Sequence, residues 1–243
     1  MLGILGGMGP LATVEFMRKL ILRSSDAGES GCMPMLAVVD GRIPDRSSAI
    51  VGPGTCPSPL PDMLRCLRLI ESPQIEAVVI PCNSAHYWIS DLQSATQKPI
   101  ISMISAVADH LSGLLRHQAP PRSYGVLGTR GLLASGLYQE HLARLIRAEC
   151  DPVTEYGQSL VDKIIVEVKH GRISQARATA ECLVSVIDQA RANIWILGCT
   201  ELPVAFERIE VPDHLSLVDS TDILVDAAIV ALRSRLTFVT NAI

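Results

Sequence analysis

The sequence lacks the features that would mark a membrane, secreted or nucleic-acid-binding protein. Its 243 residues contain no apolar run near the roughly 20 residues that cross a bilayer. Residues 1–5 read as a strand that leads into glycines, not as a signal peptide. The 21 Lys and Arg residues are balanced by 25 Asp and Glu residues and form no continuous basic stripe. We therefore expect a cytoplasmic protein with no membrane and no nucleic acid among its partners.

Paired cysteine motifs are also missing. The chain contains seven Cys, an odd number with no C-x-x-C pair, so neither a disulfide framework nor a zinc ribbon is indicated. We predict no metal site. Five of the cysteines are interpreted as ordinary structural residues, at positions 32, 56, 66, 150 and 182.

Apolar strand-like runs alternate with amphipathic helical periods along the whole chain. This alternation predicts an α/β protein with mostly parallel sheets and helices on both faces. Strands are expected at 2–5, 35–40, 78–80, 98–103, 124–127, 195–197 and 215–218. Helices are expected at 10–24, 60–70, 105–118, 137–148, 160–169, 174–191 and 219–232, with another directly after Cys82. Residues 44–47 and 52–61 are expected to be loops, and Ala119-Pro120-Pro121 ends a helix.

The chain is expected to consist of two related halves. Residues 124–129 repeat the character of residues 2–7. In each half, nearly the same number of residues separates this first strand from a later strand that ends in Cys. Those two cysteines are Cys82 and Cys199. The alternative, two unrelated β-α units in a generic α/β fold, remains open.

Cys82 and Cys199 each follow an apolar strand and precede a predicted helix. A helix N-terminus stabilises a thiolate and can lower its pKa from about 8.5 to roughly 3.5–7.5. Two such thiols on opposite sides of one carbon could remove a proton from one face and deliver one to the other, which inverts the centre. Hydrogen-bond donors in the nearby turns could hold the carboxylate that accepts the developing charge. They are Asn83, Ser84, Thr129 and Thr200.

The chain resembles the aspartate/glutamate racemase family in its cofactor-independent, aspartate racemase-like branch. The motifs that carry the resemblance are Gly6-Gly7-Met8-Gly9-Pro10, Pro44-Asp45-Arg46, Pro81-Cys82-Asn83-Ser84-Ala85-His86, Lys169-x-Gly171 and Gly198-Cys199-Thr200-Glu201-Leu202-Pro203. The resemblance implies two pseudo-symmetric α/β domains with the active site in the interdomain cleft, a homodimer, and no cofactor. The expected domains are residues 1–104, completed by a C-terminal helix at 220–243, and residues 105–219.

The resemblance also implies roles for individual residues. Cys82 and Cys199 would be the two bases that racemise L-aspartate, or glutamate. Arg46 and Lys169 would bind the side-chain carboxylate, and Asn83, Ser84 and Thr200 the α-carboxylate. Supporting roles fall to Asp45, which would orient Arg46 or its loop, and to Glu201, while Met8 either lines the site or packs beneath it. Ser84 and Ser47 stand where the family often has Thr, which bears on fine specificity.

Three other interpretations remain open. Residues 7–12 match the dinucleotide-binding pattern G-x-G-x-x-A, with Asp40 as a ribose partner. A single Cys could be a covalent nucleophile, as in a related amidase, decarboxylase or isomerase. The protein could also be a sensor that binds an amino acid without turnover. His86 either tunes Cys82 or is a hydrogen-bonded structural residue.

Overall fold

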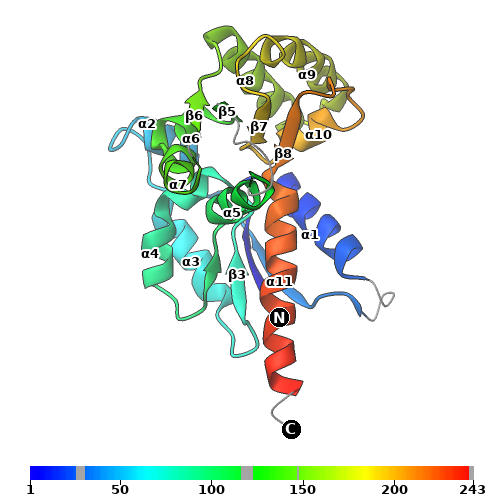
Figure 1. Ribbon diagram of the computed structural model, residues 1–243. Helices are drawn as coiled ribbons and strands as arrows, with labels where there is room; N and C mark the ends of the chain where they lie inside the picture. The colour runs from blue at the N-terminus through cyan, green and yellow to red at the C-terminus, as the bar shows by residue number, and fades with distance from the viewer. Residues whose placement is uncertain (26–30, 116–122, 147, 241–243) are drawn as a thin grey trace. The chain divides into compact units, whose positions relative to one another are not determined.

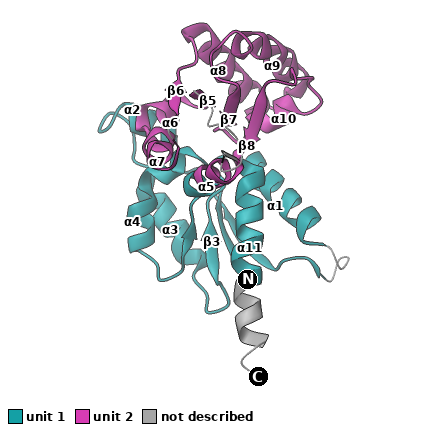
Figure 2. Ribbon diagram, viewed as in Figure 1, with its two compact units in different colours: residues 1–106, 221–243 teal, residues 107–220 magenta. Residues whose placement is uncertain are grey.

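The chain divides into two compact units, each built around its own sheet. The computed structural model describes residues 1–25, 31–115, 123–146 and 148–240, without the side chains of residues 115 and 234–240. Unit 1 comprises Met1–Ala106 and Thr221–Ile243, and unit 2 comprises Val107–Ser220 (Figure 2). Within these described residues, each sheet has four strands, and every strand pairing is parallel. The predicted α/β class with two mostly parallel, helix-flanked sheets is confirmed.

Unit 1 has the strand order β2-β1-β3-β4. Its elements are β1 (Leu2–Gly6), α1 (Pro10–Ser24), β2 (Met35–Val39), α2 (Arg46–Val51), α3 (Leu60–Ile70), β3 (Ala77–Val79), the 3₁₀ helix η2 (Ser84–Trp88), α4 (Ile89–Ser94), β4 (Ile100–Ile101) and the start of α5 (Met103–Leu115) (Figure 1). The chain returns to this unit through α11 (Ser220–Thr240).

Helices cover both faces of the unit 1 sheet because its strand residues are apolar on both sides. Ile4 and Val79 face a cluster that α1 and α11 complete. Leu5 and Val78 face a second cluster, which α3 and the segment after β3 complete. Central parallel strands buried on both faces need such continuous apolar runs.

Unit 2 repeats this topology with the strand order β6-β5-β7-β8. Its elements are β5 (Ser123–Leu127), α6 (Arg130–Ser135), α7 (Leu137–Leu145), β6 (Glu149–Asp151), α8 (Glu155–Lys169), α9 (Ile173–Ile187), β7 (Ile194–Leu197), α10 (Leu202–Phe206) and β8 (Ser216–Asp219). Helices α8 and α9 lie side by side and share a core cluster with β5 and β7 (Figure 1). Trp195 is a fully buried member of this cluster, and Gly125 makes room for its indole, because a Cβ at Gly125 would lie 2.2 Å from the ring.

Several element boundaries differ from the sequence-based expectations. Residues 46 and 47 begin helix α2, because the side chain of Asp45 accepts a hydrogen bond from the Ser48 N–H and caps the helix. The helix expected after Cys82 is a 3₁₀ turn followed by the short α4. Strand β6 was not expected, and α11 extends beyond residue 232. Residues 116–118 and the predicted helix end at 119–121 lie outside the described residues.

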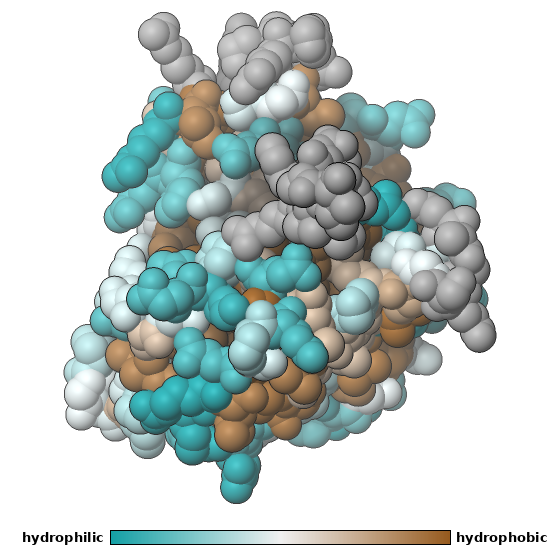
Figure 3. All heavy atoms as spheres, turned by 90° about the horizontal axis from the view of Figure 1, so that it is seen from below, coloured by the Kyte–Doolittle hydropathy of each residue, from teal (hydrophilic) through white to brown (hydrophobic). Residues whose placement is uncertain are grey.

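All seven cysteines are free thiols. Within the described part of the chain, no helix is both long and apolar enough to cross a membrane. Some large apolar side chains remain exposed, among them Leu22, Leu69 and Val230. Figure 3 shows apolar residues at the surface between polar ones on one face of the molecule.

Candidate active site

In unit 1, the turn after β1 can only be made with glycine at position 7. Gly7 has φ +96°, and a Cβ there would lie 2.4 Å from the carbonyl oxygen of Asp40. The turn carries Met8, whose side chain is buried in the same apolar cluster as Cys82. The carbonyl of Met8 accepts a hydrogen bond of 3.0 Å from Arg46 Nη2. The Met8 side chain is therefore part of a core cluster of unit 1, and its backbone oxygen is part of the surroundings of Arg46.

Arg46 is a buried cation held by backbone carbonyls. Its Nη1 donates to the carbonyls of Ile43 (3.2 Å) and Pro44 (2.9 Å), and the residue is only 9% exposed. The Nε–H is buried without a hydrogen-bond partner, and no acidic side chain in the described residues forms an ion pair with this guanidinium. A buried charge normally has a counter-charge. Arg46 is therefore suited to bind an anionic group of a ligand.

The segment after β3 brings Cys82 to the carboxyl end of a central strand, next to the end of β1. Cys82 is 7% exposed, and Asn83 and Ser84 that follow it are also buried. The 3₁₀ helix η2 beginning at Ser84 packs against α2, which begins at Arg46. Unit 1 thus brings five of the predicted site residues into one neighbourhood: Met8, Arg46, Cys82, Asn83 and Ser84.

Unit 2 places Cys199 in the same way, after the central strand β7. The Gly198 N–H donates to the carbonyl of Leu127 at 2.7 Å, so the end of β7 is bonded to the end of β5. Gly128 lies against Gly198, and Thr129 caps α6 by accepting a hydrogen bond from Leu132 N at 3.2 Å. Cys199 and Thr129 therefore follow adjacent strands at the same edge of the sheet.

Cys199 and Glu201 form a buried pair. The thiol of Cys199 donates to Glu201 Oε2 at 2.9 Å, and Thr200 Oγ1 donates to the same oxygen at 3.3 Å. Burial raises the pKa of the Cys199 thiol well above its usual range, and the negative charge of Glu201 adds to the rise, while Lys169 opposes it. The expectation of a lowered pKa is wrong for Cys199. Its following helix, α10, has only five residues, so there is little dipole to offset burial.

Lys169 is the last residue of α8 and is exposed. Its positive charge acts to lower the pKa of the Cys199 thiol, against the larger effects of burial and Glu201. Lys169, Thr129, Cys199, Thr200 and Glu201 are thus the predicted site residues that unit 2 contributes.

One buried polar residue of this region was not predicted. Gln158 Nε2 donates to the carbonyl of Gly128 (3.0 Å) and to Asp162 Oδ1 (2.8 Å), so α8 holds the turn that carries Thr129. Both partners are acceptors, which fixes the orientation of the amide. The sequence contained a signal for this position, because Gln158 lies three residues before the buried Val161 on the inner face of α8.

The surroundings of Asp40 argue against the dinucleotide interpretation. Its carboxylate accepts hydrogen bonds from Arg42 Nε (2.9 Å) and Nη2 (2.9 Å) and from Arg65 Nη2 (2.7 Å). The Arg42 and Arg65 guanidinium groups hold the pKa of this carboxyl far below its usual range. A ribose partner must accept hydrogen bonds from the ribose hydroxyl groups. Both carboxylate oxygens of Asp40 already accept hydrogen bonds from arginine side chains of the protein itself.

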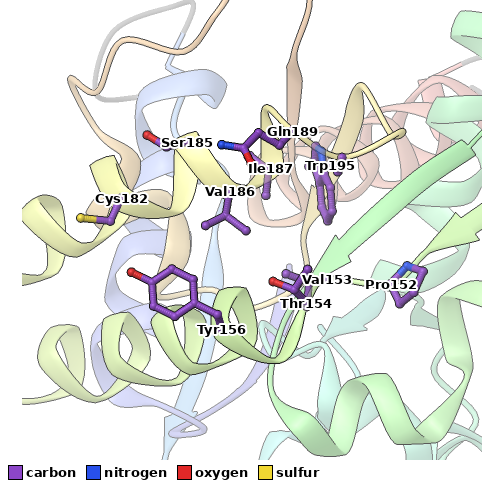
Figure 4. A pocket seen from close by; sticks show the side chains of 11 residues that line it. Pro152, Val153, Thr154, Tyr156, Cys182, Ser185, Val186, Ile187, Gln189 and Trp195 are labelled. Carbon is purple, nitrogen blue, oxygen red and sulfur yellow. The ribbon is translucent and has the colours of Figure 1, made fainter.

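Two cavities lie away from the predicted site residues. A cavity of about 610 Å³ in unit 2 lies between the start of α8 and the second half of α9, and its lining includes Tyr156, Cys182 and Trp195 (Figure 4). A cavity of about 250 Å³ in unit 1 includes Cys32 in its lining. Within the described residues, no group of three or more His, Cys, Asp or Glu is placed to hold a metal ion.

The chain is similar to known proteins in both sequence and fold. The sequence model of the family described as Asp/Glu/Hydantoin racemase matches residues 5–228. The broad specificity amino-acid racemase of Bacillus subtilis is 23% identical over 235 residues, which are 94% of this chain and 96% of that protein. A glutamate racemase of Mycobacterium bovis is 27% identical over 210 residues, 81% of this chain and 73% of that protein. The aspartate racemase structure of Picrophilus torridus has a TM-score of 0.80 and 26% identity, covering 95% of this chain and 93% of that chain.

Proposed function

The chain belongs to the Asp/Glu/hydantoin racemase family, and on that premise we propose that it racemises an acidic amino acid, with aspartate as the first candidate substrate and glutamate as the second. The reaction would be cofactor-independent. We also propose that the protein is cytoplasmic and forms a homodimer, and light scattering after size-exclusion chromatography tests the dimer.

The single observation that carries the choice of an acidic substrate is the state of Arg46. Among the described residues, this 9% exposed cation is bonded only to carbonyls and its Nε–H has no partner, so an incoming carboxylate would stabilise it. We assign the substrate's side-chain carboxylate to Arg46, with Lys169 as a second cation. A neutral side chain would leave the buried charge uncompensated, which favours acidic amino acids over the broad range named for the Bacillus subtilis relative.

We assign the proton transfers to Cys82 and Cys199, one from each unit. In one direction, the Cys82 thiolate takes the α-proton and becomes a thiol, while the Cys199 thiol gives its proton to the opposite face of the carbon and becomes a thiolate. The reverse direction exchanges the two roles. The Cys199–Glu201 hydrogen bond supports this assignment, since it keeps a transferable proton on Cys199.

Thiolate chemistry alone supplies a small part of the rate. Full ionisation of a thiol that is a few per cent ionised near neutral pH gains about 2 kcal/mol, whereas enzymes supply about 8 kcal/mol or more. The remainder has to come from stabilising the carbanion as an enolate-like α-carboxylate. We assign the donors for this group to the turns beside the two thiols: Asn83, Ser84, Thr129 and Thr200.

The experiment is incubation of single L-amino acids with the protein in D2O, without added cofactor. We expect loss of the α-hydrogen and formation of the D-enantiomer for aspartate or glutamate, measured by NMR and chiral chromatography. Cys82→Ala and Cys199→Ala should each abolish racemisation, while Cys182→Ala, at an exposed thiol, should not. Substantial racemisation by Cys82→Ala contradicts the two-base assignment, and tight binding without isotope exchange indicates a sensor.

A further inference from the structure

The backbone of Cys82 is held on both sides of the residue. Its N–H donates to the carbonyl of Ile80 at 2.7 Å, which closes a three-residue turn around Pro81. Such a turn needs a central φ near the value that proline imposes. On the other side, the carbonyl of Cys82 lies 2.9 Å from Nδ1 of His86. Both peptide groups of Cys82 are therefore fixed, and with them the direction of its side chain.

The His86 ring joins this carbonyl to the first residue of α5. His86 is 1% exposed, and its Nε2 lies 2.9 Å from the N–H of Met103. A backbone N–H can only donate, so Nε2 accepts and carries no proton. A carbonyl can only accept, so Nδ1 carries the proton. His86 is thus neutral in the Nδ1–H tautomer, and each of its ring nitrogens is bonded to a backbone group.

The second thiol is held differently. The carbonyl of Cys199 accepts from the backbone N–H of Leu202 at 3.0 Å, within its own turn. At Cys82 a side chain joins the cysteine carbonyl to another helix, whereas the carbonyl of Cys199 bonds within its own turn, so Cys199 serves as an internal control in the same protein.

We propose that His86 is a positioning residue that fixes the direction of the Cys82 thiol by bonding the Cys82 carbonyl to the N-terminus of α5. The inference rests on the proposed racemase function, in which Cys82 must meet the α-carbon in line with its hydrogen. Misplacement of a reacting group by about 1 Å costs on the order of 100-fold in rate. The ring acts on the backbone and does not touch the substrate.

Two variants separate the two hydrogen bonds of the ring. His86→Asn places an amide N–H close to the position of Nδ1 and keeps the bond to Cys82. His86→Gln reaches farther, keeps an acceptor for the Met103 N–H and loses the bond to Cys82. Each variant loses one buried hydrogen bond, so we expect similar falls in Tm. We expect kcat to fall roughly 100-fold in His86→Gln and less than roughly tenfold in His86→Asn, with KM for aspartate unchanged in both.

The proposal is overturned if the two variants have equal kcat values, or if kcat of His86→Gln stays within tenfold of wild type. If His86 had a purely structural role, the two variants would lose similar amounts of activity because their Tm values fall by similar amounts. Two further measurements do not depend on racemisation, and so separate this inference from the proposed function. Ring ¹⁵N NMR should show a protonated Nδ1, and a protonated Nε2 refutes it. Iodoacetamide labelling, read by peptide mass spectrometry, should change in rate at Cys82 in His86→Gln but not in His86→Asn, relative to Cys199. An unchanged ratio in both variants also refutes it.

Discussion

Replacing Arg46 by Met tests the acidic substrate most directly. The substitution keeps an apolar stem in the buried site and removes the cation. It also removes the three hydrogen bonds to the carbonyls of Met8, Ile43 and Pro44. The loss of these bonds is offset in part, because the variant no longer pays the desolvation free energy of burying the Arg46 charge. We expect a fall in the free energy of unfolding of roughly 0.5–3 kcal/mol, which leaves the variant folded.

The effect on substrate should be larger than the effect on folding. Two charge-assisted hydrogen bonds to a carboxylate, each worth roughly 1.5–3 kcal/mol, sum to about 3–6 kcal/mol. This corresponds to a loss of about 10²- to 10⁴-fold in kcat/KM for aspartate. At a ligand concentration of about 100 Kd for wild type, bound aspartate stabilises the fold by ~2.7 kcal/mol, and 100-fold weaker binding reduces this to ~0.4 kcal/mol.

The assays are chiral chromatography of the D-aspartate formed and thermal melts with and without aspartate. Arg42→Met is the matched control, because the side chain of Arg42 is 84% exposed and its guanidinium is bonded to Asp40. It should retain wild-type kcat/KM. The reasoning is refuted if Arg46→Met stays within tenfold of wild type in kcat/KM and keeps the full stabilisation by aspartate.

Three other substitutions test the local physics. Glu201→Gln removes the charge that helps to raise the pKa of Cys199, so Cys199 should be alkylated at lower pH than in wild type, and an unchanged pH profile of labelling counts against the pair. Gly7→Ala should cost more stability than Gly54→Ala in urea melts, because both have positive φ, worth roughly 1–3 kcal/mol of strain, but only Gly7 also meets the backbone of Asp40. In Asp40→Asn, the loss of stability on acidification should be smaller. The wild-type carboxyl has a depressed folded-state pKa, so its contribution is present above an unfolded pKa of about 3.9 and is lost as pH falls below it. Equal acid slopes in the two proteins would contradict this.

The fold could be predicted from the sequence because its strands are continuous apolar runs with two buried faces. Val78 and Val79 are neighbours in the sequence but pack against different helices, so both faces of their strand are buried. The boundaries of the helices and strands were harder to predict. Helix α2 has six residues and depends on the Asp45 cap, so it lies below the length at which periodicity is informative. Strand β6 has three residues and is defined by pairing with β5, a non-local contact.

The sequence singles out candidate site residues, but it does not reveal their electrostatics. Cys82, Cys199 and Arg46 stand out through their motifs, whereas protonation depends on contacts that the motifs do not contain. The rise in the Cys199 pKa follows from burial by the surrounding core and from the side-chain orientation of Glu201. The Nδ1–H tautomer of His86 follows from the hydrogen bond between its Nε2 and the Met103 N–H, and Met103 is distant from the motif in sequence.

The difference between the two thiols has a kinetic consequence for the proposed reaction. A negative carboxylate lies beside Cys199, so the free enzyme carries its proton there, and this protonation state matches only one of the two enantiomers. Enantiomers have equal free energies in water, so kcat/KM must be the same in both directions whatever the surroundings of the two cysteines. The asymmetry can therefore appear only as a parallel change in kcat and KM, and the enantiomer with the higher kcat must also have the higher KM. Because the negative charge of Glu201 helps to keep the proton on Cys199, Glu201→Gln should bring the two kcat values closer together. It should also bring the two KM values closer by the same factor.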